Sequence, residues 1–230
     1  MSDARTLVSE LAAGSLLRSF DDAELEVLLR AAKRRDLTRG EEVIRQGDEG
    51  DFAVALLSGH LKVSIVSPNG REIILAYAEP GEVLGEIALI DKEPRTATVS
   101  AIEPTIVLMI PAQAFEAAAM ASPKAMLRML QVMAGRVRQL NLMVEGDRSF
   151  TAAPRLARVL VRLMETDGRL RVAPNQSELG AFAGMARENV NRILTDWEGS
   201  GLVRRTGRTI EILDPEYIRE LAQFGDPDTI

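Results

Sequence analysis

Two short runs decide the fold: residues 85–90 read Gly-Glu-Ile-Ala-Leu-Ile, and residues 94–98 read Pro-Arg-Thr-Ala-Thr. Gly85 lets the backbone pass close to a ligand, and the residues after it can form one turn of helix whose first N–H groups lack a partner within the helix. Such a turn attracts an anion, and Arg95 can return to hold the same anion with two parallel hydrogen bonds. The pattern therefore predicts a binding site for a phosphate group.

Other residues of these runs extend the predicted site beyond the phosphate. Thr96 supplies a hydroxyl donor, and Glu86 can accept a hydrogen bond from a sugar hydroxyl. Ile87 and Ala88 are expected to offer their backbone amides to the phosphate. The ligand indicated is a phosphate that still carries its ribose. In a competing interpretation the runs form a corner between strands, where Arg95 and Glu86 only pair with each other.

The composition is that of a globular chain of 230 residues, which is long enough for two small domains. Hydrophobic residues make up 46% of it, yet no run approaches the ~20 apolar residues that cross a bilayer. The first twenty residues interleave charges with leucines, which is typical of an amphipathic helix rather than a signal peptide. We expect a cytoplasmic protein that does not insert into a membrane.

The absence of cysteine and the scarcity of histidine exclude most metal and redox chemistry. Without cysteine there are no thiolate ligands for an iron–sulfur cluster and there is no thiol nucleophile. The single histidine, His60, cannot alone build a zinc or non-haem iron site. We therefore expect no metal, no haem and no iron–sulfur cluster. An enzyme on a cupin-like barrel would need several histidine ligands, so we expect no catalytic residues either.

Residues 33–110 have the pattern of a β-sandwich or barrel. Short runs rich in β-branched residues are separated by glycine turns, and residues 61–65 alternate between apolar and polar side chains. Residues 67–70, Ser-Pro-Asn-Gly, are expected to form a hairpin turn before a strand over 72–78. We predict a first domain over residues 1–122, built as a β-barrel with the run at 85–90 as its helical interruption.

A helix of roughly seven turns is predicted over residues 123–148. Its apolar residues follow three- and four-residue steps, which is typical of a coiled-coil seam, and a homodimer is the simplest way to cover that seam. The seam consists of Leu127, Leu130, Ala134, Val137, Asn141 and Val144. Two interpretations of Asn141 stay open: it fixes the register of two paired helices, or it binds the edge of a purine.

Residues 149–230 have the spacing of a winged helix-turn-helix domain. Helices are predicted over residues 175–183 and 186–198, with Gly184 and Met185 between them. Asn175 or Ser177 is expected to cap the first helix. Residues 204–212 follow as two short strands around a Thr-Gly turn, which form a basic wing.

The exposed side of the second helix carries residues that can read base pairs. Arginine can hold O6 and N7 of guanine, and glutamate can accept from N4 of cytosine. Because the net charge of the chain is −6, DNA contact must come from a local patch, and residues 185–210 form a positive one. The predicted DNA-binding residues are Arg187, Glu188, Asn191, Arg192, Ser177 and Arg205. An adjacent arginine and glutamate on a helix are also common as a solvated pair.

The order of these parts resembles the CRP/FNR family of transcription regulators across nearly the whole chain. Residues 85–98 resemble the phosphate-binding cassette of cyclic-nucleotide-binding domains, in which Gly-Glu and two small or apolar residues precede a loop and Arg-Ser/Thr-Ala. Residues 187–192, Arg-Glu-Asn-Val-Asn-Arg, match the Arg-Glu-x-x-x-Arg recognition helix of the family. The resemblance implies an α+β fold, with a jelly-roll cyclic-nucleotide domain, a long dimerisation helix and a winged helix-turn-helix.

The same resemblance implies a function and a set of partners. Cyclic AMP, or else cyclic GMP, is the implied allosteric ligand, seated against the long helix. The implied DNA target is double-stranded, with inverted TGTGA-like half-sites bound by a homodimer, and RNA polymerase is the implied protein partner. Ligand binding would rotate the two DNA-binding domains into register.

The chain departs from the family at the positions that hold the base. Members that bind cyclic AMP contact adenine with hydroxyl groups on the barrel and on the long helix, whereas Ala76, Leu140 and Asn141 stand at the matching positions here. The phosphate and ribose positions are retained, and Thr96 is compatible with cyclic AMP or cyclic GMP. The loop at 166–169 is shorter than the family's usual polymerase-contacting surface. A second interpretation keeps DNA binding and drops the ligand, with the barrel as a dimerisation scaffold.

Overall fold

The structure is a computed structural model that describes residue 17 and residues 20–165, 167–207 and 209–225. The amphipathic helix expected in the first twenty residues therefore lies almost entirely outside the described residues. The chain divides into two compact units, Met1–Ser67 with Leu75–Val137 and Pro68–Ile74 with Arg138–Ile230. The domain boundaries expected after residues 122 and 148 stay predictions.

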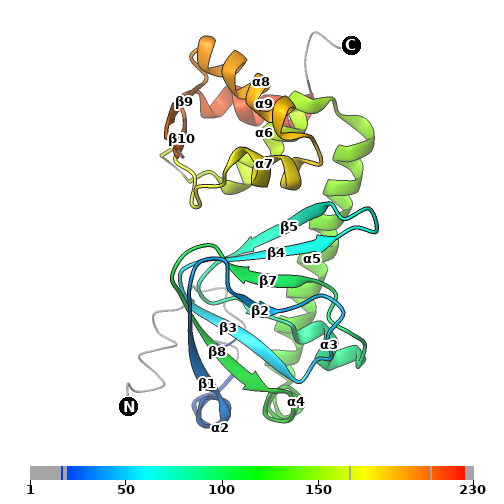
Figure 1. Cartoon of the computed structure of the whole chain (residues 1–230). Helices are drawn as coiled ribbons and strands as arrows, with labels where there is room; N and C mark the ends of the chain where they lie inside the picture. Colours follow the sequence, from blue (N-terminus) through cyan, green and yellow to red (C-terminus); the bar gives the residue numbers. More distant parts are fainter. Residues whose placement is uncertain (1–16, 18–19, 166, 208, 226–230) are drawn as a thin grey trace. The chain divides into compact units, whose positions relative to one another are not determined.

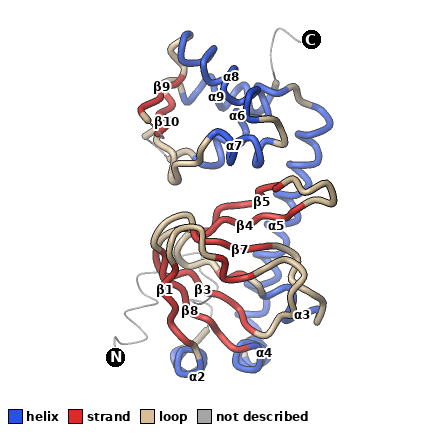
Figure 2. The backbone as a smooth tube through the Cα atoms, viewed as in Figure 1, coloured by secondary structure: helices blue, strands red, loops and turns tan. Residues whose placement is uncertain are grey.

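Eight of the described strands form two four-stranded sheets in the first part of the chain (Figures 1 and 2). The first sheet has the order β1 (Lys33–Leu37), β8 (Thr105–Pro111), β3 (Phe52–Ser58) and β6 (Val83–Leu84). The second has the order β2 (Glu42–Ile44), β7 (Thr98–Ala101), β4 (Leu61–Val66) and β5 (Glu72–Ala78). The predicted strands and the turn between β4 and β5 are confirmed.

Strand β3 shows why the sheets pack as they do. Successive side chains of a strand point to opposite faces, and all four residues from Ala53 to Leu56 are buried. Val54 and Leu56 belong to the core between the two sheets, together with Leu61 and Val99 of the second sheet. The small residues on the other face of β3 belong to a second core, under the helices. The first sheet is thus covered on both faces.

Helices supply the second core. Helix α2 (Asp22–Ala31) begins with a capping box between Asp21 and Glu24 and buries Leu25 and Leu28. Helix α4 (Ala112–Ala121) buries Phe115 against the same cluster. Both helices pack against the first sheet.

The long helix α5 (Pro123–Ser149) is confirmed to within one residue of the prediction. Proline is well suited to the first position of a helix, and Ser122 Oγ accepts from the amide of Ala125 at 3.3 Å. Ala125 and Met129 enter the core beneath α4. A different side of the helix leaves large apolar residues 52–61% exposed, namely Leu127, Leu130, Val137 and Val144.

The last part of the chain is a helix-turn-helix with a two-stranded wing (Figure 1). Its elements are α6 (Ala152–Leu163), α7 (Gln176–Ala183), α8 (Arg187–Gly199), β9 (Val203–Thr206), β10 (Thr209–Ile212) and α9 (Pro215–Phe224). Asn175 rather than Ser177 caps α7, because its side chain accepts from the amides of Ser177 and Glu178. Helix α9 was not predicted, although Asp214 caps it and Pro215 occupies its first turn.

The turn between α7 and α8 depends on glycine. A Cβ at Gly180 would lie 2.7 Å from the carbonyl oxygen of Met185, and Gly184 ends α7 at φ +65°. Helix α8 then buries Val190, Leu194 and Trp197 on one side. Its other side is exposed.

Candidate functional site

The cassette begins at Gly85, which has φ +80° and precedes the short helix α3 (Glu86–Asp91). A Cβ at Gly85 would lie 2.6 Å from Arg95 Nη1 and 2.7 Å from Ile44 Cδ1. The close approach of a ligand that was expected at this glycine stays a prediction. In the structure, the group that approaches Gly85 is a protein side chain.

Arg95 is held under the backbone of the cassette. Its Nη1 donates to the carbonyl of Gly85 at 2.7 Å, and its Nη2 donates to the carbonyl of Phe52 at 2.6 Å. The guanidinium also lies 4.8 Å from the centre of the Phe52 ring, and the residue is 4% exposed. Burial lowers the pKa of Arg95, against the opposing effect of Asp51, Glu86 and Asp48. Arg95 donates to backbone carbonyls rather than to Glu86. The interpretation in which Arg95 and Glu86 only pair with each other at a corner between strands is therefore wrong.

Glu86 is also buried, and its partner comes from α5. One carboxylate oxygen, Oε1, accepts from Arg136 Nη1, while Arg136 Nη2 donates to the carbonyl of Val83 at 3.0 Å. The other oxygen, Oε2, is buried without a hydrogen-bond partner among the described residues. The sequence analysis missed Arg136. The signal was a lone arginine in register with Met129, Met133 and Leu140, on an otherwise apolar side of the helix.

The remaining predicted ligand residues are spread between the two compact units. Ala88 is buried in α3 and Ile87 is half-buried, while Thr96 is exposed beside Arg95. These residues join Gly85, Glu86 and Arg95 at one corner of the first unit. Asn141 is exposed on α5 and belongs to the second unit.

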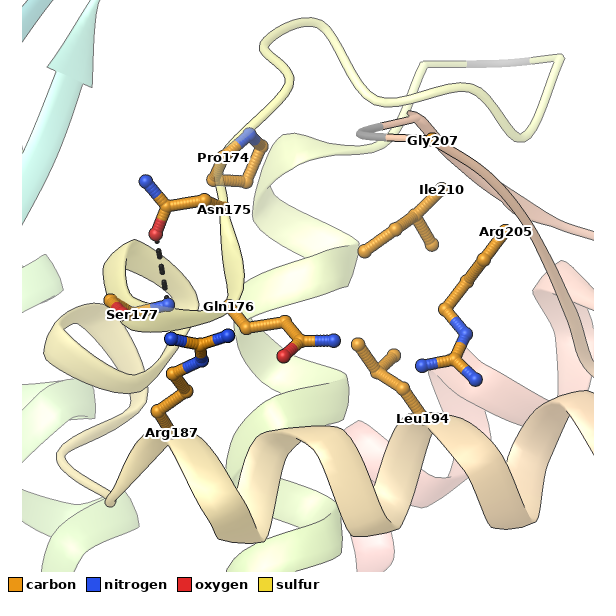
Figure 3. A pocket seen from close by; sticks show the side chains of 9 residues that line it. All are labelled: Pro174, Asn175, Gln176, Ser177, Arg187, Leu194, Arg205, Gly207 and Ile210. Carbon is orange, nitrogen blue, oxygen red and sulfur yellow. Dashed lines mark hydrogen bonds between the residues drawn. The ribbon is translucent and has the colours of Figure 1, made fainter.

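A groove of about 460 Å³ lies on the helix-turn-helix unit (Figure 3). It is lined by residues from the start of α7, from α8 and from the wing: Pro174, Asn175, Gln176, Ser177, Arg187, Leu194, Arg205, Gly207 and Ile210. Three predicted DNA-binding residues, Ser177, Arg187 and Arg205, thus line one surface. In Figure 3 the side chains of Gln176 and Arg205 extend toward each other over α8.

The arginines of α8 and of the wing have different surroundings. Arg187, Glu188 and Arg192 are exposed, and within the described part of the chain none of them forms an ion pair. The side chain of Arg205 is only 23% exposed, and its Nε and Nη2 donate to Glu198 Oε2 at 2.9 and 2.6 Å. These hydrogen bonds, with another from the backbone of Arg205, lower the pKa of Glu198.

Asn191 of α8 is hydrogen-bonded to side chains of both α7 and β9. Its Oδ1 accepts from Gln176 Nε2 at 3.0 Å and from Arg205 Nη1 at 3.3 Å. Arg205 also donates to Thr195 Oγ1 at 3.2 Å. Asn191 and Arg205 were both predicted to contact DNA, and the structure joins them to each other.

Comparison with known proteins accounts for both parts of the chain. A cyclic nucleotide-binding domain model matches residues 34–122, and a Crp-like helix-turn-helix domain model matches residues 154–221. The transcriptional activator protein Anr of Pseudomonas protegens is 30% identical over 89% of this chain and 86% of its own. This chain belongs to the CRP/FNR family of transcription regulators. The predictions of the family, of the α+β fold and of a regulator rather than an enzyme are confirmed.

Two further proteins are similar to this chain over most of its length. The CRP-like cAMP-activated global transcriptional regulator of Mycobacterium tuberculosis is 28% identical over 93% of this chain and 98% of its own. The solved structure of CLP, the c-di-GMP responsive global regulator of Xanthomonas campestris, shares the fold with a TM-score of 0.72. It is 22% identical and covers 84% of this chain and 100% of its own.

Two further findings concern metals and membranes. Among the described residues, no three His, Cys, Asp or Glu side chains are grouped so that they could hold a metal ion. No helix in the described part of the chain has the length and apolar character needed to span a bilayer.

Proposed function

We propose that this CRP/FNR regulator binds a cyclic nucleotide at the cassette, and that the ligand raises its affinity for DNA as a homodimer. Cyclic AMP is the proposed ligand, and cyclic GMP is the alternative. The observation that carries the proposal is Glu86, a residue 1% exposed whose Oε2 lacks a described partner. A buried acceptor without a donor costs about 1–3 kcal/mol. A ribose hydroxyl that donates to Oε2 would remove this cost.

The phosphate would be held by groups next to Glu86. Arg95 is close enough to the α3 backbone to exchange its two carbonyl partners for two phosphate oxygens, which accept the same fork of donors. The amides of Ile87 and Ala88 and the hydroxyl of Thr96 are the remaining proposed donors. Because Arg95 already has partners, ligand binding requires their exchange.

Arg136 would couple the bound ligand to the long helix α5. The ribose would bind the carboxylate to which Arg136 is bonded, so the ligand and α5 share Glu86. A ligand shifts a conformational equilibrium only by the difference in its affinity for the two states. We propose that the geometry of the Glu86–Arg136 pair is part of that difference.

The proposed homodimer rests on the exposed apolar side of α5. Leu127, Leu130 and Val137 are each more than half exposed, and they continue the seven-residue pattern of a coiled-coil seam. Apolar surface on this scale is typical of an interface. Equilibrium sedimentation should show a dimer, and Leu130→Glu should shift it toward monomer.

The proposed DNA contact is made by the exposed side of α8. Arg187 and Arg192 are free to hold guanines in the major groove, and Glu188 can accept from cytosine, which fits TGTGA-like half-sites in inverted repeat. RNA polymerase is proposed as the protein partner from the family resemblance.

Titration calorimetry on the full-length protein tests the ligand. Cyclic AMP, cyclic GMP and a cyclic dinucleotide should be compared with wild type, Glu86→Gln and Arg95→Leu. We expect one cyclic mononucleotide to bind wild type and neither variant to retain that affinity. Unchanged affinity in Arg95→Leu would remove the cassette as the binding site.

A second candidate is a regulator that binds DNA without a ligand. It is favoured by the existing partners of Arg95 and Glu86, which hold the cassette closed by protein contacts alone. Operator affinity measured with and without cyclic AMP separates the candidates. Equal operator affinities with and without cyclic AMP, together with no calorimetric signal for the nucleotides, would favour the regulator that binds DNA without a ligand.

A further inference from the structure

A chain of hydrogen bonds joins the first helix, the recognition helix and the wing of the DNA-binding unit. Gln176 of α7 and Arg205 of β9 both donate to Asn191 Oδ1, at 3.0 and 3.3 Å. Arg205 is anchored in turn by Glu198, whose Oε1 accepts from the Arg205 amide at 3.0 Å and whose Oε2 accepts from its guanidinium. The four side chains come from three different elements.

The chemistry of arginine fixes which way the amide of Asn191 points. A guanidinium has five N–H donors and no acceptor, so the group that Asn191 presents to Arg205 must be its oxygen. An amide oxygen accepts two hydrogen bonds through its two lone pairs, and here Gln176 and Arg205 supply two donors. What remains on Asn191 is the Nδ2 amino group, which only donates.

We propose that Gln176, Arg205 and Glu198 are positioning residues that make Asn191 a donor-only reader of DNA. This inference rests on the proposed contact between α8 and the major groove. Asparagine recognises adenine by donating to N7 and accepting from N6 at the same time, which requires a free Oδ1. With Oδ1 engaged, Asn191 can only donate, which favours guanine, whose N7 and O6 are both acceptors, over adenine, whose only major-groove acceptor is N7.

The same geometry bears on Arg205, which was predicted from the sequence to contact DNA. As a nonspecific contact, Arg205 would point its charge at a DNA phosphate. In the structure it lies against α8, with Glu198 as its counter-ion and Thr195 as a further acceptor. The adjacent Arg204 provides a contrast, because it pairs with Glu211 of the wing at 2.8 Å.

Binding of full-length protein to duplexes with all four base pairs at each half-site position tests the proposal. The position read by Asn191 is the one where Asn191→Ala relaxes the wild-type preference. There, wild type should prefer guanine over adenine by about tenfold, the scale of one base contact. Arg205→Met should bring adenine to within about twofold of guanine, since it frees one of the two lone pairs of Oδ1 to accept from adenine N6. Arg204→Met, the matched control, should leave the preference unchanged.

Asn191→Asp adds a readout that a merely structural role would not move. Its carboxylate keeps acceptors for Gln176 and Arg205 and presents a second acceptor to the DNA, so the preference should turn toward cytosine or adenine, which carry amino groups. Should Arg205→Met fail to fold, Gln176→Met removes the other donor and should restore part of the adenine binding.

Two outcomes would overturn the proposal. One is a uniform loss of affinity across all duplexes in Arg205→Met, which would make Arg205 a phosphate contact. The other is a wild-type preference for adenine at the position read by Asn191. If Arg187→Ala still weakens binding in either case, the DNA interface on α8 stands without this inference. If neither Arg187→Ala nor Asn191→Ala affects DNA binding, the proposed DNA interface on α8 and this inference both fail.

Discussion

The cassette and the exposed side of α8 use the same chemical groups in opposite surroundings. In the cassette, Glu86 and Arg95 are at most 4% exposed and are bonded to other parts of the protein. On α8, Arg187, Glu188 and Arg192 are exposed and form no ion pair with a described residue. A ligand at the cassette must therefore displace existing partners, whereas DNA at α8 displaces mainly water and counter-ions. If both proposed contacts form, binding at the cassette would rearrange protein contacts, and binding at α8 would leave them in place.

Arg136→Met should give the largest effect on stability, because it removes the partner of the buried Glu86 carboxylate. Removing one partner of a buried ion pair leaves the other charge without compensation, which costs about 3–5 kcal/mol of unfolding free energy. Urea unfolding followed by circular dichroism measures the change. The double variant Glu86→Gln with Arg136→Met is the control and should recover much of the loss. A loss of less than about 1 kcal/mol in the single variant, as for an exposed pair, would show that Glu86 is not confined as described.

Gly85→Ala tests how tightly the cassette is packed around Arg95. Gly40 has nearly the same backbone conformation, φ +84° against +80°, but a Cβ there would meet no atom within 4 Å. Gly40→Ala should cost about 1–2 kcal/mol from backbone strain alone. Gly85→Ala should cost about 1–3 kcal/mol more, because its Cβ would overlap Arg95 and Ile44. Equal losses of unfolding free energy would mean that Arg95 moves aside freely.

Arg187→Ala should change DNA affinity without changing stability. The loss of a bidentate guanine contact should weaken operator binding by about 1–3 kcal/mol at one base position. The unfolding free energy should stay within about 0.5 kcal/mol of wild type, as for other exposed positions. Arg219→Ala on α9 removes the same charge from an exposed position outside the groove. If both variants weakened binding equally, Arg187 would act through net charge alone.

Glu198→Gln should give a small effect on stability, and the effect should depend on pH. The pKa of Glu198 is lowered below 4.5 in the folded protein by its hydrogen bonds to Arg205. Its contribution is therefore present above the unfolded pKa and is lost as the pH falls through the folded pKa. The melting temperature of wild type should exceed that of Glu198→Gln at pH 7, and the difference should disappear as the pH falls through the folded pKa of Glu198. A difference that is constant with pH would contradict the ionised pair.

Local patterns were sufficient to predict most of the elements. The alternation in residues 61–65 predicted β4, the turn at 67–70 predicted that β5 follows it, and the three- and four-residue steps predicted α5 to within one residue. The helix-turn-helix followed from its spacing, to within one residue at each end of α8. Helix α9 was missed because Asp214 and Pro215 were not recognised as a helix start. These features depend on residues close in sequence.

The partners of the charged groups could not be predicted in the same way. Arg95 bonds the carbonyl of Phe52, 43 residues away, and any residue type at that position would present the same carbonyl. Glu86 bonds Arg136, 50 residues away, and only the folded chain brings α5 to that corner. The cassette motif predicted Gly85, Glu86 and Arg95 as ligand-binding residues, and that stays a prediction. It did not reveal that their donors and acceptors are already engaged.

In α8, the residues that pack the helix are different from the residues that are exposed on it. This separation has a consequence for how the DNA sequence preference of such a regulator can change. The packing of this helix depends on Val190, Leu194 and Trp197. Its angle to α7 depends on Gly180, where a side chain would collide with the backbone of Met185. None of these residues lies among the exposed side chains that would meet base pairs. New operator preferences can thus arise by exchange of surface side chains on an unchanged scaffold, one half-site position at a time.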